Sequence, residues 1–320
     1  MVDYDAMERL RIQGKKSSSI VIVGFILFVL GVIFSTFSGV IVQLFLSFIS
    51  DGDIEDGFVR LLAFVCVLIG CVLVVVGMRK KKAARRCFMR IYKPSCLVPL
   101  IKEMFEGVSY FPNEGFSEEI FKQIPLICLG DRYRSYDYME GVYHGIYFQQ
   151  AAVKTWTPDE KKRDEIGFGG TWLIADFGKK FDYDVKIVNH FFSGEKIGTG
   201  YTKVDTENVK FNKVYGVYAK DPHEAFYIVT PQVMEACLWA ADYFRANPLM
   251  FCFVDNKLHI AFSQYEGFFD PSFDEPVTEE NIRKQVMQGV SLFTIIIDCF
   301  CLPFYEGYFN GAEVKDDVIS

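Results

Sequence analysis

The sequence has few of the residues from which enzyme active sites are commonly built. It contains four histidines among 320 residues, and no two of them are spaced as in the His-Glu-x-x-His motif of zinc enzymes. It has no Gly-x-Ser-x-Gly motif, and its Gly-rich stretch at residues 166–171 lacks the Lys-Ser or Lys-Thr of a phosphate-binding loop. These absences exclude the common local motifs of zinc enzymes, serine hydrolases and nucleotide-binding proteins, and we expect neither a metal nor a cofactor.

An excess of positive charge and a disulfide framework are missing as well. The formal net charge is −7, whereas a nucleic-acid-binding protein needs a basic face. The nine cysteines are an odd number without framework spacing, and Cys299-Phe300-Cys301 is not the Cys-x-x-Cys of redox proteins. The composition therefore predicts no nucleic-acid partner and a reducing compartment.

Charge is absent from a long stretch near the N-terminus. No charged residue occurs from Ile20 to Ile49, and a helix needs about 20 residues to cross the hydrocarbon core of a membrane. We predict a first span over about residues 20–42 and a second over about residues 58–78, joined by an acidic loop. Residues 18–78 would then form a transmembrane hairpin whose two spans have no charge in their interior, which makes it an anchor rather than a pathway.

A cluster of basic residues follows the second apolar stretch. It consists of Arg79, Lys80, Lys81, Lys82, Arg85 and Arg86. Because cytoplasmic segments beside membrane spans are enriched in Lys and Arg, this cluster predicts that both termini are cytoplasmic. The protein would be a multi-pass protein of the plasma (inner) membrane, with a cytoplasmic tail at residues 1–17 and a basic juxtamembrane segment at residues 79–93. The cluster could serve topology alone or could also bind anionic lipid headgroups.

The rest of the chain predicts a cytoplasmic α+β domain over residues 94–303, followed by a polar tail at residues 304–320. Stretches rich in aromatic and β-branched residues predict strands at residues 138–148, 169–177, 184–192 and 211–218, and a hairpin at residues 251–262. The charged stretch 154–165 indicates an exposed loop. No helical pattern separates the first strands, which favours a mainly antiparallel sheet with several packed helices.

Two proline-containing pairs mark helix starts in this domain. Asp221-Pro222-His223-Glu224 places an acid at the N-cap, proline at the first helical position and glutamate at the third. Thr230-Pro231 repeats the arrangement before a longer helix, and a last helix is expected over about residues 278–302. Asp221, His223 and Glu224 are also the only local group of acids and imidazole. They could cap the helix, or they could form a metal or general-base site.

The order of these features resembles a bacterial membrane protein family known as domain of unknown function 3137. The main similarity is at residues 211–235, where a strand leads into Asp-x-x-Glu-Ala and then into Thr-Pro. Tyr110-Phe111-Pro112, residues 135–141 and Phe168-Gly169-Gly170 add to the resemblance, which extends over residues 18–303. The family implies a membrane-anchored α+β domain without an established activity.

These expectations favour a membrane-anchored cytoplasmic module that binds or scaffolds other molecules. Its partners would be the lipid bilayer, a membrane protein or further copies of the chain. A membrane-tethered enzyme of hydrolase type, built on Asp221, His223 and Glu224 with dispersed acids, stays open as an alternative. An accessory subunit of a membrane complex is a further alternative.

Overall fold

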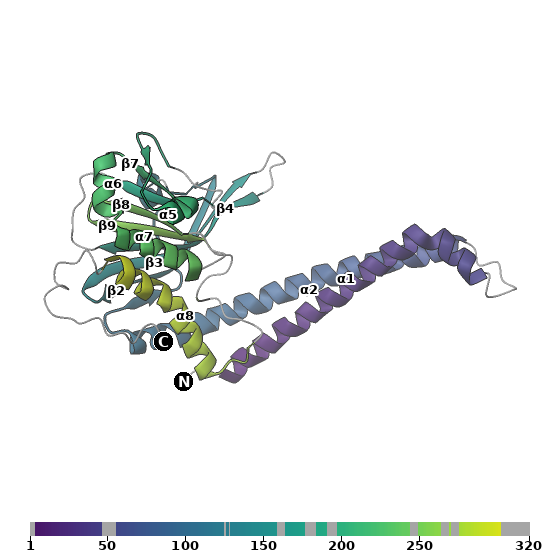
Figure 1. Ribbon diagram of the computed structural model, residues 1–320. Coiled ribbons are helices and arrows are strands. Elements are labelled where there is room, and N and C mark those ends of the chain that lie inside the picture. Colours follow the sequence, from purple (N-terminus) through teal and green to yellow (C-terminus); the bar gives the residue numbers. More distant parts are fainter. Residues whose placement is uncertain are drawn as a thin grey trace. The chain divides into compact units, whose positions relative to one another are not determined.

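The computed structural model describes residues 4–46, 56–124, 126–127, 129–158, 164–176, 184–190, 197–243, 249–263, 269 and 275–301. The chain divides into two compact units. The first comprises Met1–Cys96 with Pro271–Ile282, and the second comprises Leu97–Asp270 with Arg283–Ser320. Helices and an antiparallel sheet are both present, which confirms the predicted α+β class (Figure 1).

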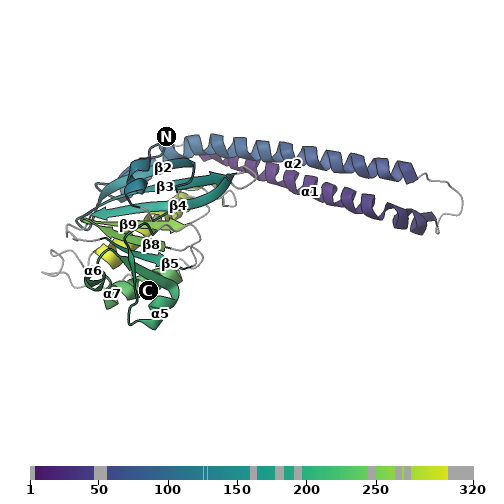
Figure 2. The same ribbon diagram turned by 90° about the horizontal axis from the view of Figure 1, so that it is seen from above.

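Two long helices form most of the first unit. Helix α1 spans Tyr4–Leu46 and α2 spans Asp56–Tyr92, and they lie side by side and antiparallel (Figures 1 and 2). Glycines allow the two backbones to approach closely. A Cβ atom on Gly70 would lie 2.7 Å from the backbone nitrogen of Phe28 and 2.8 Å from the carbonyl oxygen of Gly24. Small residues at such contacts are typical of closely packed helices in membranes.

Residues 4–17 of the predicted N-terminal tail form the first turns of α1. Met7 is fully buried, and its Sδ atom accepts a hydrogen bond from the Cys96 thiol at 3.8 Å. The Glu8 carboxylate accepts a hydrogen bond from the backbone N–H of Val277 at 3.0 Å. Helix α1 therefore extends well beyond the stretch needed for a membrane span, and its N-terminal end is packed within the first unit.

Helix α2 continues without a break through the basic cluster. It is followed by a π-helical turn, η1, at Lys93–Leu97 and by α3 at Val98–Met104. The change of helix type coincides with Pro94, because a proline ring removes an N–H donor and clashes with the preceding turn of an α-helix. Pro99 lies in the first turn of α3, where the missing N–H would have no partner in the helix.

The second unit is built on a sheet of nine strands among the described residues. The strands are β1 (Ser109–Phe111), β2 (Arg132–Tyr143), β3 (Ile146–Pro158), β4 (Asp164–Asp176), β5 (Val185–Asn189), β6 (Thr202–Val204), β7 (Tyr215–Ala219), β8 (Leu249–Val254) and β9 (Lys257–Ser263). Their order in the sheet is β1-β2-β3-β4-β9-β8-β5-β7-β6, and every pairing is antiparallel. The strands at both edges, β1 and β6, have three residues each.

Helices cover both faces of this sheet. The helices of this unit after α3 are α4 (Glu118–Gln123), α5 (Val209–Val214), α6 (Pro222–Ile228), α7 (Pro231–Tyr243) and α8 (Glu279–Ile296), and α8 leads into a π-helical turn, η2 (Ile297–Cys301). On one face, Phe148 stacks on Phe293 of α8 with ring centres 4.1 Å apart, and Phe251 lies 4.8 Å from Phe300 of η2. Helix α4 lies on the opposite face.

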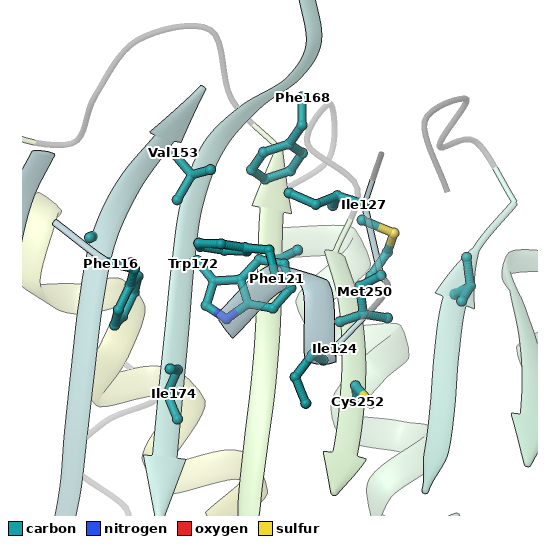
Figure 3. Close-up of a cluster of buried hydrophobic side chains, with 14 residues drawn as sticks. Phe116, Phe121, Ile124, Ile127, Val153, Phe168, Trp172, Ile174, Met250 and Cys252 are labelled. Atoms are coloured by element: carbon teal, nitrogen blue, oxygen red, sulfur yellow. The ribbon is translucent and has the colours of Figure 1, made fainter. Parts of the chain in front are cut away.

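The core beneath α4 is centred on Trp172, which is fully buried (Figure 3). The Phe121 ring of α4 meets the Trp172 ring edge to face, with ring centres 4.7 Å apart. The surrounding side chains come from α4, the segment after it and strands β3, β4, β5, β8 and β9, and include Ile124, Ile127, Val153, Phe168, Ile174, Val188, Met250, Cys252 and Ala261. This core fixes α4 on the middle of the sheet.

Three of the predicted local structures were wrong. Residues 138–148 form the end of β2 and the start of β3, joined by a turn in which His144 and Gly145 have φ values of 48° and 82°. Much of the charged stretch 154–165 is strand, because Lys154 pairs with Gly169 in the β3–β4 ladder. Pairing with long antiparallel neighbours therefore stabilises a strand here, although the local sequence is typical of loops.

The third error concerns residues 211–218, which were predicted as one strand. Residues 211–214 instead belong to α5. The side-chain oxygen of Asn208 accepts hydrogen bonds from the backbone N–H groups of Lys210 and Phe211, at 3.0 and 3.1 Å. This N-cap stabilises a helix start that the apolar pattern of the following residues conceals.

Candidate functional site

The predicted group of Asp221, His223 and Glu224 lies at the start of α6. The Asp221 carboxylate accepts a hydrogen bond from the backbone N–H of His223 at 2.9 Å, so the predicted N-cap is confirmed. The His223 side chain is exposed, and Glu224 is half-buried in the first turn of the helix. A cap of this kind stabilises a helix by about 1 kcal/mol, which accounts for Asp221 without a catalytic role.

The other three histidines lie on different elements. His144 is in the β2–β3 turn, His190 follows β5 with its Nε2 atom 3.2 Å from the carbonyl oxygen of Asn212, and His259 is in β9. Among the described residues, no group of three or more His, Cys, Asp or Glu side chains could hold a metal ion. The histidines therefore form no common centre in this part of the chain.

His259 belongs to the core beneath α4. The indole N–H of Trp172 donates a hydrogen bond to its Nδ1 atom at 3.3 Å. Burial, together with the smaller effect of the positive charge of Lys257, lowers the pKa of His259 to about 3. The imidazole is thus neutral at physiological pH and acts as a hydrogen-bond acceptor inside the core.

A buried lysine is the main feature of the second unit that was not predicted from the sequence. Lys186 lies in β5, and its side chain is fully buried. Its Nζ atom donates a hydrogen bond to the carbonyl oxygen of Ile197 at 2.5 Å and lies 4.0 Å from the centre of the Tyr201 ring. An ammonium group is attracted to the face of an aromatic ring, and the attraction is stronger away from water. Residues 197–201 therefore cover the amine.

Asp184 holds this cover in place from one side. Its carboxylate accepts a hydrogen bond from the Tyr201 hydroxyl at 2.9 Å and pairs with the Lys220 ammonium at 2.5 Å. The Lys220 Nζ atom also lies 5.6 Å from the centre of the Tyr201 ring. Two amines and one carboxylate thus surround the same tyrosine.

Lys186 stands in a row with two other reactive side chains. It pairs across the sheet with Cys252 of β8, and Cys252 pairs with His259 of β9, so the three side chains lie on one face. Burial raises the pKa of the Cys252 thiol to about 12, which keeps the thiol protonated. Burial lowers the pKa of Lys186 to about 8, against the opposing effect of the Asp184 carboxylate. The charge of this amine therefore changes close to physiological pH.

A second polar group joins the β2–β3 turn to η2. The Oδ1 atom of Asp298 lies 3.0 Å from Nδ1 of His144, and Oδ2 accepts a hydrogen bond from the Tyr143 hydroxyl at 3.2 Å. The rings of Tyr143 and His144 stack with centres 4.1 Å apart. Burial raises the pKa of Asp298, while His144 acts in the opposite direction. This group links the end of the last helix to the sheet.

Weak signals for both groups are present in the sequence. A lysine inside the apolar run Val185-Lys186-Ile187-Val188 is unusual for a strand that is buried on both faces. His144 occupies a turn position with positive φ, where Asn, Asp or Gly is the usual choice. Neither signal predicts which residues are in contact with Lys186 or His144, because only the fold brings Tyr201 and Asp298 close to them.

The helix pair carries an apolar outer surface. The side chains of Phe25 and Phe64 are 60% and 64% exposed, and many aliphatic side chains of both helices are also exposed. Among the described residues, one helix, at Tyr4–Ile33, is long and apolar enough to cross a membrane. This finding supports the first of the two predicted spans.

The basic residues of the two helices lie close together. Arg79, Lys80, Lys81, Lys82 and Arg86 are exposed on α2, and Arg85 is half-buried. A Cβ atom on Gly77 would lie 3.2 Å from the carbonyl oxygen of Ser17, which sets the register of the two helices. The exposed Lys15 and Lys16 of α1 are therefore at the level of the cluster on α2. We call these eight residues the basic belt.

The fold thus combines an antiparallel α+β unit with a pair of long helices whose outer surface is apolar. Residues 166–302 match the family described as "Protein of unknown function (DUF3137)". The match confirms the family resemblance predicted from the sequence, over the stretch from β4 to the end of η2.

Comparison of the sequence with curated proteins gives no match. Among solved structures, the chain is similar to the crystal structure of the mycobacterial trehalose monomycolate transport factor A, TtfA, with 14% sequence identity. The similarity covers 62% of this chain and 92% of that chain, with a TM-score of 0.34.

Proposed function

We propose that the protein is a membrane-anchored cytoplasmic module that binds a partner protein. The observation that carries this proposal is the apolar outer surface of the helix pair. Moving one large apolar side chain out of water is worth about 1.5–3 kcal/mol, so many exposed side chains together favour a nonaqueous surrounding strongly. A lipid bilayer supplies that surrounding on all sides of the pair.

Both helices are long enough to cross the plasma (inner) membrane. They have 43 and 37 residues, whereas about 20 residues span the hydrocarbon core. Two antiparallel spans place both termini on one side. The basic belt lies directly beyond the apolar stretch, and because Lys and Arg are enriched on the cytoplasmic side of membrane spans, it supports a cytoplasmic location for both termini. There it would attract anionic lipid headgroups, at about 1 kcal/mol per basic residue.

Neutralising the cluster on α2 should disturb the orientation of the helix pair. A reporter fused after Ser320 of the intact chain should be active only in the cytoplasm. After replacement of Arg79, Lys80, Lys81, Lys82, Arg85 and Arg86 by glutamine, we expect a mixed population, because positive charge beside the spans sets orientation.

The matched control replaces six exposed lysines of the second unit by glutamine: Lys122, Lys203, Lys210, Lys213, Lys257 and Lys284. It should leave the reporter signal of the intact chain unchanged. A signal from the opposite side of the membrane in the unaltered protein would refute the proposed topology.

Exposed aromatic side chains on α6 and α7 support the binding of a partner. Trp239 and Tyr243 stack with ring centres 5.0 Å apart and are 44% and 55% exposed. Phe226 and Tyr227 of α6 are also exposed. Aromatic residues are enriched where proteins bind one another, and they often dominate the binding energy. A membrane protein or a second copy of this chain is the partner that we propose.

Removing the pair on α7 should abolish recovery of this partner. From gently solubilised membranes, the intact chain should retain a specific partner that the Trp239→Ser, Tyr243→Ser double variant loses at least tenfold. Unchanged thermal unfolding would show that the variant is folded, and a Met287→Ser variant of an exposed residue on α8 serves as the matched control. Equal recovery with the double variant, or no specific partner in several detergents, would contradict the proposal.

A further inference from the structure

Lys186 carries a charge at a position where the fold offers no need for one. The other residues of β5 are buried, and Val185, Ile187 and Val188 are apolar. Replacing a buried charge by a well-packed apolar side chain of similar volume often leaves stability unchanged or raises it. A buried lysine that the packing of the strand does not require, and that has well-placed contacts, is therefore a candidate for a functional role.

The contacts of Lys186 are concentrated on one short segment. They join β5 to residues 197–201 through the carbonyl oxygen of Ile197 and the ring of Tyr201. Directly after this segment comes β6, which among the described residues is an edge strand paired with Val217–Ala219 of β7. We propose that Ile197–Val204 is a proton-sensitive cover over this face of the sheet, and that protonation of Lys186 favours its opening.

The backbone of the cover is suited to such a movement. Gly198 and Gly200 have φ values of 85° and 82°, in the region that favours glycine. A Cβ atom on Gly200 would meet no atom within 4 Å, so the glycine is required by its backbone conformation and not by packing. The two glycines flank Thr199 and lie between Ile197 and Tyr201, the two residues that contact Lys186. A change of φ and ψ at the glycines would release both of these contacts.

The direction of the proton effect follows from linkage. In the closed form, the Ile197 carbonyl oxygen, the Tyr201 ring and the Asp184 carboxylate favour the charged amine. Burial outweighs these contacts and lowers the pKa of Lys186 to about 8, whereas a solvated lysine has its ordinary value of 10.5. The open form therefore binds the proton more tightly, and opening becomes more favourable as the pH falls from about 10.5 to about 8. The two pKa values differ by about 2.5, so protonation can raise the equilibrium constant for opening by at most about 300-fold. This maximum is reached below about pH 8.

Other polar groups face the amine from the elements packed around it. They are Asp184 before β5, Tyr201 in the cover, Lys203 in β6, Tyr218 in β7, Lys220 after β7 and Cys252 in β8. The Asp184 carboxylate favours the charged amine and Lys220 disfavours it. Burial raises the pKa values of the Tyr201 hydroxyl and the Cys252 thiol, so both stay protonated over the range in question.

Hydrogen exchange of the full chain in detergent tests this inference. We expect the amides of Thr202–Val204, after correction for the intrinsic exchange rate, to be about 20-fold better protected at pH 9.5 than at pH 7.5. Lys186→Met should remove this pH dependence and keep the segment protected at both pH values. Lys203→Met, which changes an exposed lysine of β6, should retain it.

Equal protection of the unaltered chain at the two pH values would overturn the inference, whether or not the Lys186→Met variant folds. So would a pH dependence that persists in a folded Lys186→Met variant. A Tyr201→Leu variant, which lacks the ring and the hydroxyl that hold the cover, should exchange faster at both pH values. Unchanged protection in that variant would show that these contacts do not hold the segment.

Discussion

Replacing Trp172 with alanine should lower the free energy of unfolding of the second unit by about 3–5 kcal/mol. The side chain is fully buried at the centre of the core beneath α4, so its removal leaves a large cavity (Figure 3). The Phe121 ring loses its edge-to-face partner, and the Nδ1 atom of His259 loses its hydrogen-bond donor. In calorimetry of the full chain, the midpoint of the corresponding transition should fall by about 10 °C.

Two variants separate the causes of this effect. Trp172→Phe keeps much of the apolar volume but not the indole N–H, so we expect a loss of about 1–2 kcal/mol. Trp239→Ala removes an exposed indole and should change stability by less than about 0.5 kcal/mol. Equal stability of Trp172→Ala and Trp239→Ala would contradict the described packing of α4 on the sheet.

Replacing Gly70 with valine should separate the two helices of the first unit. Even a single Cβ atom at this position would lie within 3 Å of backbone atoms of Phe28 and Gly24. Real Cβ atoms do not approach backbone atoms so closely, and a backbone cannot move aside as a flexible side chain can. Overpacking typically costs about 1–3 kcal/mol, and a β-branched side chain at a backbone contact belongs at the upper end of this range.

The measurement uses a protease site inserted within residues 47–55, between α1 and α2. After cleavage in mild detergent, the α1 fragment of the otherwise unaltered chain should copurify with the rest of the protein, and that of Gly70→Val should be lost. Val72→Leu enlarges an exposed side chain on the same helix and is the matched control. Copurification of the Gly70→Val fragments in full would show that the glycine contact does not hold the helices together.

Features set by a few neighbouring residues could be predicted from the sequence. The N-cap at Asp221 and the hairpin at residues 251–262 are confirmed, because capping and tight turns depend on residues within one or two turns. The strand at residues 154–158 was missed, since it is stabilised by partners on β2 and β4 and not by its own charged sequence. Local sequence patterns therefore predicted helix starts and tight turns better than the lengths of the strands.

The polar groups of the second unit could not be predicted in the same way. Asp298 lies 154 residues from His144, and the neighbours of Lys186 come from β7, β8 and the segment before β6. Cross-strand pairing brings such residues together, and its register is a property of the whole sheet. Sequence patterns indicate groups of residues that are close in the chain, and the one such group, at Asp221, is explained by helix capping.

The two three-residue edge strands have a consequence for a chain that shares a surface with its own copies. If the chain is anchored in a membrane as proposed, its copies are concentrated in two dimensions, where an open sheet edge could pair with the edge of a neighbouring molecule. Short strands at both ends leave little backbone for a neighbour to pair with. If the cover at Ile197–Val204 opens, the edge of β7 becomes available for an added strand. Proton uptake by one buried amine would then govern whether neighbouring molecules remain separate or join through a continuous sheet.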